Sequence, residues 1–276
     1  MPLSPLQSRI LGVIAQHRNP ESFVAGGTVI QRAGFRHSKD IDIFNDRKER
    51  LAEAAYLDFD ALKAKGFDVA WERETDTMYR ARVGDGASET RIDWVVDSEF
   101  RFFPAMPDGE FGYALHPLDL AANKLLAAVG RVEVRDALDL LWIDEHVQPV
   151  GAVAWAAVEK DPGWMPDGLL SDLRWRARYQ DRLLAEEQIS IPMTAGDLNN
   201  AMRALVARAE RLVAAMPRHL EYGALLNRDG SLAKPAPDDP ASFEGIVVHH
   251  GSRKGCWPGT MEIASAMLRD GSYPSP

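Results

Sequence analysis

The chain has 276 residues, of which 46% are hydrophobic and 26% are charged, and its formal net charge is -9. This composition suits a globular protein of one large or two small domains, and the net charge disfavours broad, non-specific binding of nucleic acid. A single cysteine, Cys256, excludes an internal disulfide and a cysteine-based metal cluster. The N-terminus lacks a signal-peptide pattern and no apolar run is long enough for a membrane span, so we expect a soluble, cytoplasmic protein with no membrane partner.

Helical and strand patterns alternate over the first hundred residues. In chain order, the predicted elements are a helix over 6–17, a buried strand over 22–27 that ends at a glycine turn, one or two helical turns over 28–34, a strand over 39–45, an amphipathic helix over 47–66, a strand pair over 67–86 and a strand over 90–97. Residues 100–117 are rich in aromatic residues and prolines and are predicted to be mainly loop. These patterns indicate an α/β unit over 1–115.

Helical patterns dominate from Pro117 onward. In chain order, the predicted elements are a helix over 117–146 that either runs unbroken or breaks near Gly130, a helix over 165–187, a helix over 194–216 with Asp197 as N-cap, and one short helix over 260–268. Residues 220–276 otherwise have little periodicity. We therefore expect a helical unit over 116–219 and an irregular extension over 220–276.

Two acidic residues, Asp40 and Asp42, stand in the predicted strand "KDIDIFN". Because side chains at i and i+2 point to the same face of a strand, the two carboxylates share a face, while Ile41 and Ile43 face the core. Adjacent like charges repel, so this arrangement destabilises the protein unless a cation or solvent relieves it. Mg²⁺ or Mn²⁺, which take carboxylate oxygens together with substrate phosphates, are suitable cations.

A third acidic residue, Asp93, lies inside the apolar strand pattern "RIDWVVD". Buried charges are rarely left unpaired, so this carboxylate needs a partner. Together with the two carboxylates of the earlier strand it could hold the two metal ions of an in-line phosphoryl or nucleotidyl displacement. The alternative is that D-x-D occurs here by chance and that Asp93 pairs with Arg91 or Arg36.

Small and polar residues accompany the carboxylates. Gly26 and Gly27 lack a Cβ, so a phosphate could approach their backbone N–H groups. Ser38 could donate to a phosphate oxygen, and Arg36 could face phosphate or pair with a carboxylate. Each feature also has a structural alternative. The two glycines could form a tight turn, Ser38 could cap a strand end, and Arg36 could form an ion pair.

Taken in order, Gly26-Gly27, Asp40-Ile41-Asp42 and Asp93 resemble the signature of the nucleotidyltransferase superfamily that shares the DNA polymerase β fold. Within this superfamily, the sequence most resembles the AbiEii/AbiGii group. Many proteins of that group are toxins of bacterial toxin–antitoxin systems. The residues that carry this likeness are Arg36-His37-Ser38-Lys39-Asp40-Ile41-Asp42, then Lys124, Arg131 and Arg135-Asp136-Ala137-Leu138-Asp139-Leu140. The resemblance covers about residues 20–145 and implies a mixed sheet flanked by helices, followed by an α-helical C-terminal half.

The same resemblance implies a Mg²⁺-dependent enzyme that moves a nucleoside monophosphate from an NTP to an acceptor hydroxyl. It implies that Asp40 and Asp42 bind metal, and that Asp93 binds a second metal or acts as general base. It also implies that Lys124 contacts the triphosphate and that Asp136 supports or orients it. The acceptor would be an RNA end such as tRNA or a protein hydroxyl, and an antitoxin protein could be a partner.

The downstream motif has physical consequences of its own. On one unbroken helix, Lys124, Arg131 and Arg135 would form a narrow cationic stripe, because offsets of 7 and 11 residues return to one face. If Gly130 breaks the helix, the second segment could fold back and bring Asp136 near Lys124. Either arrangement offers cations to a polyphosphate, and the structural alternative is a surface lysine beside an ion-paired helix.

Two other functions stay open: nucleotidylation of a small molecule such as an antibiotic, and nucleotide binding without turnover. Two further patterns are weaker. The segment "LRWRARYQDR" (173–182) could contact RNA, but we expect a solvated helix face with Trp175 packed inward. His249 and His250 with Cys256 offer too few ligands for a metal site.

Overall fold

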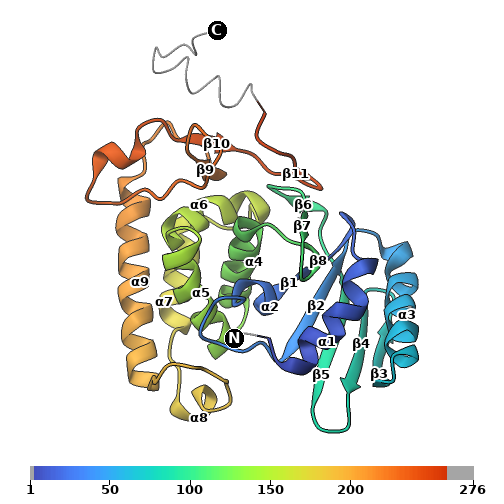
Figure 1. The fold of residues 1–276 in the computed structure, drawn as a ribbon. Coiled ribbons are helices and arrows are strands. Elements are labelled where there is room, and N and C mark those ends of the chain that lie inside the picture. The colour runs from blue at the N-terminus through green and yellow to red at the C-terminus, as the bar shows by residue number, and fades with distance from the viewer. Residues whose placement is uncertain (1–2, 260–276) are drawn as a thin grey trace. The chain divides into compact units, whose positions relative to one another are not determined.

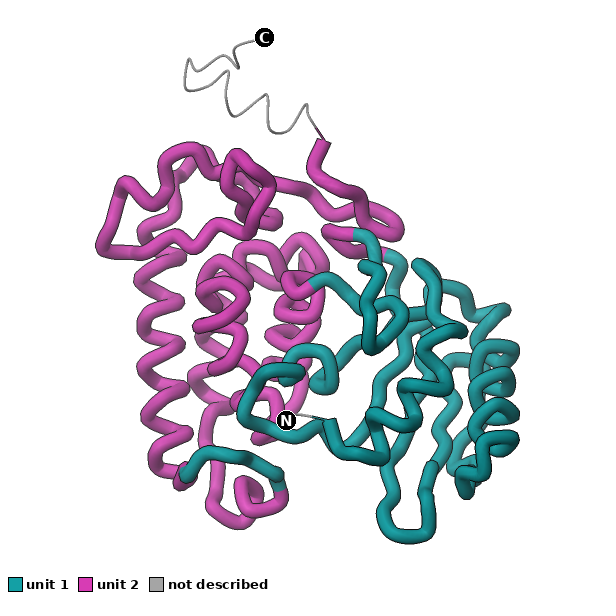
Figure 2. The backbone as a smooth tube through the Cα atoms, viewed as in Figure 1, with its two compact units in different colours: residues 1–99, 104–116, 187–192 teal, residues 100–103, 117–186, 193–276 magenta. Residues whose placement is uncertain are grey.

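The computed structural model describes residues 3–259 and contains two compact units, which are coloured separately in Figure 2. Unit 1 consists of Met1–Glu99, Pro104–His116 and Glu187–Pro192, and unit 2 of Phe100–Phe103, Pro117–Glu186 and Met193–Pro276. The short helix expected over 260–268 lies outside the described residues.

Unit 1 is built on a mixed sheet of seven strands in the order β3-β4-β5-β2-β1-β8-β7 (Figure 1). Its elements are α1 (Pro5–Ile14), η1 (Ala15–His17), β1 (Ser22–Ala25), α2 (Gly26–Ile30), β2 (Asp40–Asn45), α3 (Lys48–Ala64), β3 (Asp68–Thr75), β4 (Met78–Gly84), β5 (Glu89–Val96), β7 (Met106–Asp108) and β8 (Gly112–Ala114). Strand β2 pairs antiparallel with β1 and parallel with β5. The predicted class, a mixed sheet flanked by helices, is confirmed.

One face of the sheet carries the apolar core of unit 1. Along β2, half-buried and buried residues alternate, so Ile41 and Ile43 point to the core while Asp40 and Asp42 point to the opposite face. The buried apolar residues of α1 and α3 join the same core. The amphipathic pattern of these helices therefore determines which face of β2 is left for polar groups.

A buried ionic cluster, which we call the Asp58 hub, links α3 to the sheet. The carboxylate of Asp58 is fully buried and accepts two hydrogen bonds from Arg18 Nη2, at 2.6 and 2.8 Å. The indole Nε1 of Trp94 in β5 donates to Asp58 Oδ2 at 2.7 Å, and His17 Nδ1 lies 2.7 Å from Oδ1. Burial lowers the pKa of Arg18, and the charge of Asp58 acts in the opposite direction.

The segment expected to be mainly loop, 100–117, contains three short strands. Of these, β8 pairs parallel with β1, and β7 pairs antiparallel with β8. Two or three residues are too few to show a strand period, so the sheet pairing and not the local pattern determines these elements. Gly26 and Gly27 also differ from expectation, because they begin α2 and not a turn.

Unit 2 is mainly helical. Its elements are β6 (Phe100–Arg101), α4 (Pro117–Gly130), α5 (Val134–His146), α6 (Val150–Lys160), α7 (Pro166–Arg176), α8 (Asp181–Leu184), α9 (Ala195–Ala215), β9 (Ala224–Leu226), η2 (Pro240–Phe243), β10 (Val247–His249) and β11 (Ser252–Arg253). Helix α6, to which the sequence analysis assigns no element, is apolar on nearly every side and buried. Gly151 allows close contact with α9, since a Cβ there would lie 2.7 Å from the Ala209 carbonyl oxygen.

Two predictions about the helices of unit 2 are wrong. The helix expected over 165–187 ends at Arg176, because the backbone N–H and C=O of Tyr179 bond to the Asn199 side chain at 2.9 and 3.0 Å. Asp197 is not the N-cap of α9. Thr194 caps the helix, and Asp197 stands three residues later as the second member of a capping box.

Residues 220–259, which follow α9, are more ordered than expected. Strand β9 pairs antiparallel with β10, and β11 pairs antiparallel with β6. His249 is buried, with Nε2 2.9 Å from the Phe102 carbonyl oxygen and 3.1 Å from that of Cys256. Within residues 3–259, no helix combines the length and apolarity needed to cross a membrane.

Candidate active site on the central sheet

The carboxylates of β2 and β5 lie on one face of the sheet. The parallel register places Asp42 directly opposite Asp93, and Asp40 shares the face of Asp42 because it stands two residues away on the same strand. Asp93 is buried, whereas Asp40 and Asp42 are half-buried. The sequence prediction of one acidic face therefore agrees with the register of the two strands.

Gly26 makes room for one of these carboxylates. A Cβ at Gly26 would lie only 1.9 Å from Asp42 Oδ2, so any larger residue would displace that carboxylate. The glycine also has a φ of 70°, which lies in the left-handed region that side chains with a Cβ rarely adopt. The glycine is therefore needed for both its conformation and its small size. Gly27 is needed for its small size, since a Cβ there would lie 2.2 Å from Arg36 Nη2.

Asp93 has an ion-pair partner that the sequence analysis missed. Arg80 of β4 stands opposite Asp93 and donates from Nε and Nη2 to its two carboxylate oxygens, each at 2.6 Å. The partner is thus neither Arg91 nor Arg36. Hydrogen bonding to Asp93 raises the pKa of Arg80, and the charge of Asp40 adds to this effect. The β3–β4 hairpin was predicted, but only the strand register brings Arg80 to the acidic face.

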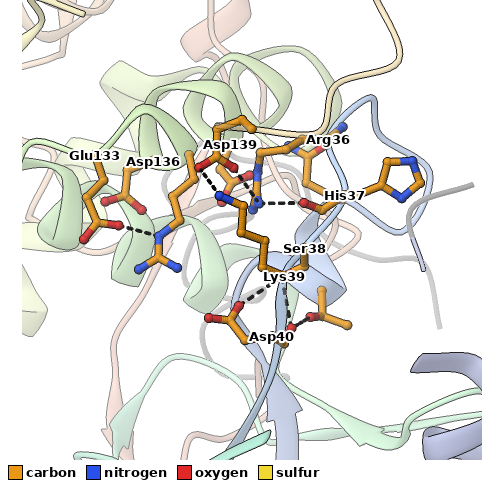
Figure 3. A network of polar contacts seen from close by, with 12 residues as sticks. Arg36, His37, Ser38, Lys39, Asp40, Glu133, Asp136 and Asp139 are labelled. Carbon is orange, nitrogen blue, oxygen red and sulfur yellow. Dashed lines mark hydrogen bonds and ion pairs between the residues drawn. The ribbon is translucent and has the colours of Figure 1, made fainter. Parts of the chain in front are cut away.

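The start of β2 is fixed by hydrogen bonds from neighbouring elements. Thr28 of α2 donates to the Asp40 carbonyl oxygen at 2.6 Å, and Ser38 donates to the same oxygen at 3.1 Å (Figure 3). Gln7 of α1 donates to the Ser38 carbonyl oxygen at 2.9 Å, and Thr90 of β5 donates to that of Lys39, also at 2.9 Å. These contacts hold Asp40 in place at the entry to the strand. Thr28, Gln7 and Thr90 carry no motif signal in the sequence.

The loop before β2 is paired with the segment 187–192. His37 N–H donates to the Gln188 carbonyl oxygen and Ser190 N–H to that of Phe35, both at 2.8 Å. The side chain of Arg36 is almost fully buried and donates to the His37 carbonyl oxygen at 3.1 Å, with Glu187 at 3.8 Å. The loop that carries Arg36 and Ser38 is therefore braced by a segment about 150 residues later in the sequence.

The second motif forms a buried ionic cluster within unit 2, which we call the Lys124 cluster. Helix α4 ends at Gly130, and α5 folds back against it. Lys124 Nζ therefore lies 3.0 Å from both Asp136 Oδ1 and Asp139 Oδ2. Arg131 Nε donates to Asp136 Oδ2 at 2.9 Å. Of the two arrangements considered from the sequence, the broken helix is the one observed. Glu133 lies 2.5 Å from Arg135 Nε at the edge of this cluster, and Figure 3 shows Glu133, Asp136 and Asp139.

Protonation states in the Lys124 cluster follow from its pairing. Burial alone would lower the pKa of Lys124, but the charges of Asp139 and Asp136 outweigh it and raise that pKa. Burial would raise the pKa of Asp136, yet hydrogen bonds from Arg131 and the charge of Lys124 lower it. Both Lys124 and Asp136 are therefore charged at neutral pH.

Tyr179, in the segment between α7 and α8, is buried. Burial, with a smaller contribution from the charge of Asp136, raises the pKa of Tyr179 to about 12. A pKa raised by folding stabilises the protein below the unfolded value of about 10, and this contribution is lost between pH 10 and 12. We expect Tyr179→Phe to reduce the loss of melting temperature between pH 9 and pH 11.5. Thermal unfolding by circular dichroism measures this, and an unchanged pH dependence would contradict the buried, unionised phenol.

The candidate site does not coincide with a hollow found in unit 1. That hollow lies at the opposite ends of β1 and β2, at Ser22 and Asn45, and its other lining residues are His17, Arg18, Asn19, Glu21, Arg47, Arg50, Glu53, Ala54 and Leu57. Gly26 and Asp40 stand at the other ends of the same strands. The acidic face is therefore separate from this hollow.

No protein-family model matches the sequence, and no curated protein matches it. The fold is similar to MenT4, a nucleotidyltransferase toxin from Mycobacterium tuberculosis H37Rv, with a TM-score of 0.56 and 18% identity over 77% of this chain and 87% of MenT4. The chain has a nucleotidyltransferase fold. The expected fold is thus confirmed.

Weaker matches are to Cid1. One is to an RNA terminal uridylyl transferase structure (TM-score 0.30, 12% identity, 90% of this chain and 72% of that one). The other is to the poly(U) polymerase with Mg and 3'-dATP bound (TM-score 0.31, 12% identity, 99% and 92%). Such low TM-scores carry no weight, and the assignment of the nucleotidyltransferase fold depends on MenT4.

The donor set on the acidic face suits a hard divalent cation. Asp40 and Asp42 present oxygen donors on one face, and the absence of a Cβ at Gly26 keeps the space that the Asp42 carboxylate occupies. In the part of the chain that the structure describes, no three acidic, histidine or cysteine side chains converge as a metal site. Asp93, the third carboxylate of the face, is ion-paired with Arg80.

Proposed function

We propose that the protein is a metal-dependent nucleotidyltransferase that moves a nucleoside monophosphate from an NTP to an acceptor hydroxyl. One observation carries the proposal: Asp40 and Asp42 share a face of β2 with Asp93 opposite, beside Gly26, on a nucleotidyltransferase fold. The acceptor we propose is an RNA end, such as that of tRNA, or a protein hydroxyl. Because MenT4 is a nucleotidyltransferase toxin, we also propose that this chain is the toxin of a toxin–antitoxin pair.

Asp40 and Asp42 are the residues that would hold Mg²⁺ or Mn²⁺. Asp93 would join them once the guanidinium of Arg80 has left its carboxylate. A metal held there would supply Lewis-acid stabilisation of charge on the triphosphate. Until then Arg80 offsets one of the three negative charges of the acidic face, because it is bonded to Asp93 and lies within range of the charge of Asp40. A divalent cation in the place of this guanidinium would offset two of them.

In the proposed reaction, the acceptor oxygen bonds to the α-phosphorus while the bond from that phosphorus to the bridging oxygen of the leaving group breaks. Pyrophosphate carries away the electron pair of the broken bond. Asp93, once released from Arg80, is placed to accept the proton of the acceptor hydroxyl. Asp40 stays correctly placed because Thr28 and Ser38 both hold its backbone.

The remaining motif residues would bind the triphosphate. Gly26 and Gly27 offer backbone N–H groups, and the Ser38 hydroxyl lies 3.3 Å from Asp40 Oδ1 at the same end of β2. Arg36, as part of this loop, would add positive charge. In unit 2, Lys124 would stabilise the charge that develops on pyrophosphate, and Asp136 would orient it, since their atoms lie 3.0 Å apart.

Two arginines lie at the margin of the Lys124 cluster and would face the polyphosphate more directly. The side chain of Arg131 is 44% exposed and that of Arg135 is 29% exposed, whereas that of Lys124 is 9% exposed. Arg131 is therefore better placed than Lys124 to meet a solvated anion. We propose that Lys124 acts mainly on charge inside the site and that the arginines attract the NTP.

The proposal is tested by calorimetry of each NTP with MgCl₂. We expect at least one NTP to bind in Mg²⁺ and to lose that binding both in EDTA and in the Asp40→Ala/Asp42→Ala double variant. A matched control is Asp68→Asn, at an exposed acidic residue that begins the edge strand β3. NTP binding that survives in the double variant, or no binding of any NTP to the wild type, would refute the assignment.

A further inference from the structure

Trp175, near the end of α7, is 69% exposed, which is unusual for a tryptophan. The expectation that it packs inward is wrong. Helix α7 buries Leu169, Leu170 and Leu173, and position 175 lies about 200° around the helix from position 173, so Trp175 points away from that face. The helix therefore presents its largest apolar side chain to solvent.

Positive charge is concentrated around this tryptophan. Residues 173–182 contain four arginines and one aspartate, in a chain whose formal net charge is -9. The guanidinium carbon of Arg178 lies 5.6 Å from the centre of the Trp175 ring, which is cation–π range. Arg178 and Arg182 form no ion pair with any other residue of the described chain, so their charges are available to an anionic ligand.

The segment is held firmly despite its exposure. Ala177 and Tyr179 are buried, and the backbone of Tyr179 is fixed at both its N–H and C=O groups by Asn199 of α9. Arg174 pairs with Glu210 of α9, and Arg176 with Asp172 at 3.4 Å. Because the buried residues alternate with Trp175 and Arg178, the exposed ring and guanidinium are positioned before any ligand arrives.

The segment also lies close to the Lys124 cluster within unit 2. Tyr179, which separates Arg178 from the helical turn of α8, is near enough to Asp136 for that charge to affect its ionisation.

We propose that Trp175 and Arg178 form a stacking platform for an unpaired base of a single-stranded RNA acceptor, with Arg182 attracting its phosphates. This inference rests on the proposed nucleotidyl transfer and assigns its acceptor to RNA. Exposed aromatic rings next to arginines bind single-stranded nucleic acid by stacking and by charge, with little dependence on sequence. A protein surface would require further exposed apolar side chains in the segment, whereas residues 173–182 expose only Trp175 among their aromatic and large aliphatic residues.

The platform is tested by fluorescence anisotropy of a labelled 12-nucleotide single-stranded RNA of mixed sequence, without NTP. We expect Trp175→Leu, which keeps apolar bulk but removes the ring, to weaken binding by about 5-fold to about 100-fold. Trp175→Tyr should restore most of the affinity. Arg178→Gln should weaken binding and reduce its salt dependence, whereas Arg73→Gln, at an exposed arginine of the edge strand β3, should change neither.

Several outcomes would overturn the platform: equal binding by Trp175→Leu and wild type, no binding of the RNA by wild type, or loss of a dimer as the only effect of Trp175→Leu. Transfer of labelled nucleotide to protein and not to RNA would also overturn it. NTP binding measured on the same proteins separates the two proposals. If wild type binds no NTP, the nucleotidyltransferase proposal fails. If NTP binding is intact but Trp175→Leu binds RNA normally, only the platform fails.

Discussion

Asp42→Asn and Asp40→Asn should each reduce nucleotidyl transfer by about 10³-fold or more while the fold stays intact. Metal-held charge stabilisation in phosphoryl chemistry is worth several kcal/mol, and each substitution removes one of the two anionic donors on β2. The exchange of one oxygen for an NH₂ group changes the volume little, and it relieves the repulsion between the two neighbouring carboxylates. Pyrophosphate release measures the rate, and thermal unfolding checks the fold.

Asp68→Asn is the matched control, because it removes the same charge from an exposed position of β3 and should leave the rate unchanged. A variant of Asp42 that keeps a tenth or more of the wild-type rate would show that the acidic face does not carry the chemistry. A variant that loses activity together with its thermal transition would show only that Asp42 is needed for folding. Asp40→Asn would then provide the decisive comparison.

Asp58→Asn should lower the free energy of unfolding by about 3–5 kcal/mol, which is the usual cost of removing one partner of a buried ion pair. The Arg18 side chain is completely buried and loses its only carboxylate partner among the described residues. Asparagine keeps one acceptor oxygen and has an NH₂ group in place of the other, so the contacts of Trp94 in β5 and of His17 in η1, which use different oxygens of Asp58, cannot both be kept. Urea denaturation followed by circular dichroism measures the change.

The Asp60→Asn variant is the control, because Asp60 is exposed on the same helix and should change stability by about 0.5 kcal/mol or less. A double variant, Arg18→Met/Asp58→Leu, sharpens the test. Apolar residues in place of both charges leave no uncompensated ion, so the double variant should be more stable than Asp58→Asn. If Asp58→Asn were as stable as the wild type, the hub would not contribute to the fold.

The sequence predicted what depends on local periodicity. Alternation along β2 was enough to place Asp40 and Asp42 on one face, and the register with β5 then added Asp93. It could not show that Arg80 stands opposite Asp93, because that depends on how β4 and β5 are aligned. The Asp58 hub was missed for a similar reason, since Asp58 lies in an otherwise ordinary amphipathic helix.

Other elements were missed because they lack a one-sided pattern. Helix α6 is apolar on nearly all sides, so it has no amphipathic period, and β7 and β8 are too short to have one. Trp175 is exposed because it lies on the side of α7 opposite the buried leucines. The end of α7 could not be predicted, because it depends on a hydrogen bond from Asn199 of another helix.

The most direct test of nucleotidyl transfer compares two labels in the same NTP, incubated with the protein, Mg²⁺ and a cell extract cleared of small molecules. With label on the α-phosphate, we predict that radioactivity enters the RNA fraction. With label on the γ-phosphate, we predict that it leaves as pyrophosphate, and that Asp42→Asn gives neither result. Transfer of the γ-label to an acceptor would show phosphoryl and not nucleotidyl transfer, and would contradict the account.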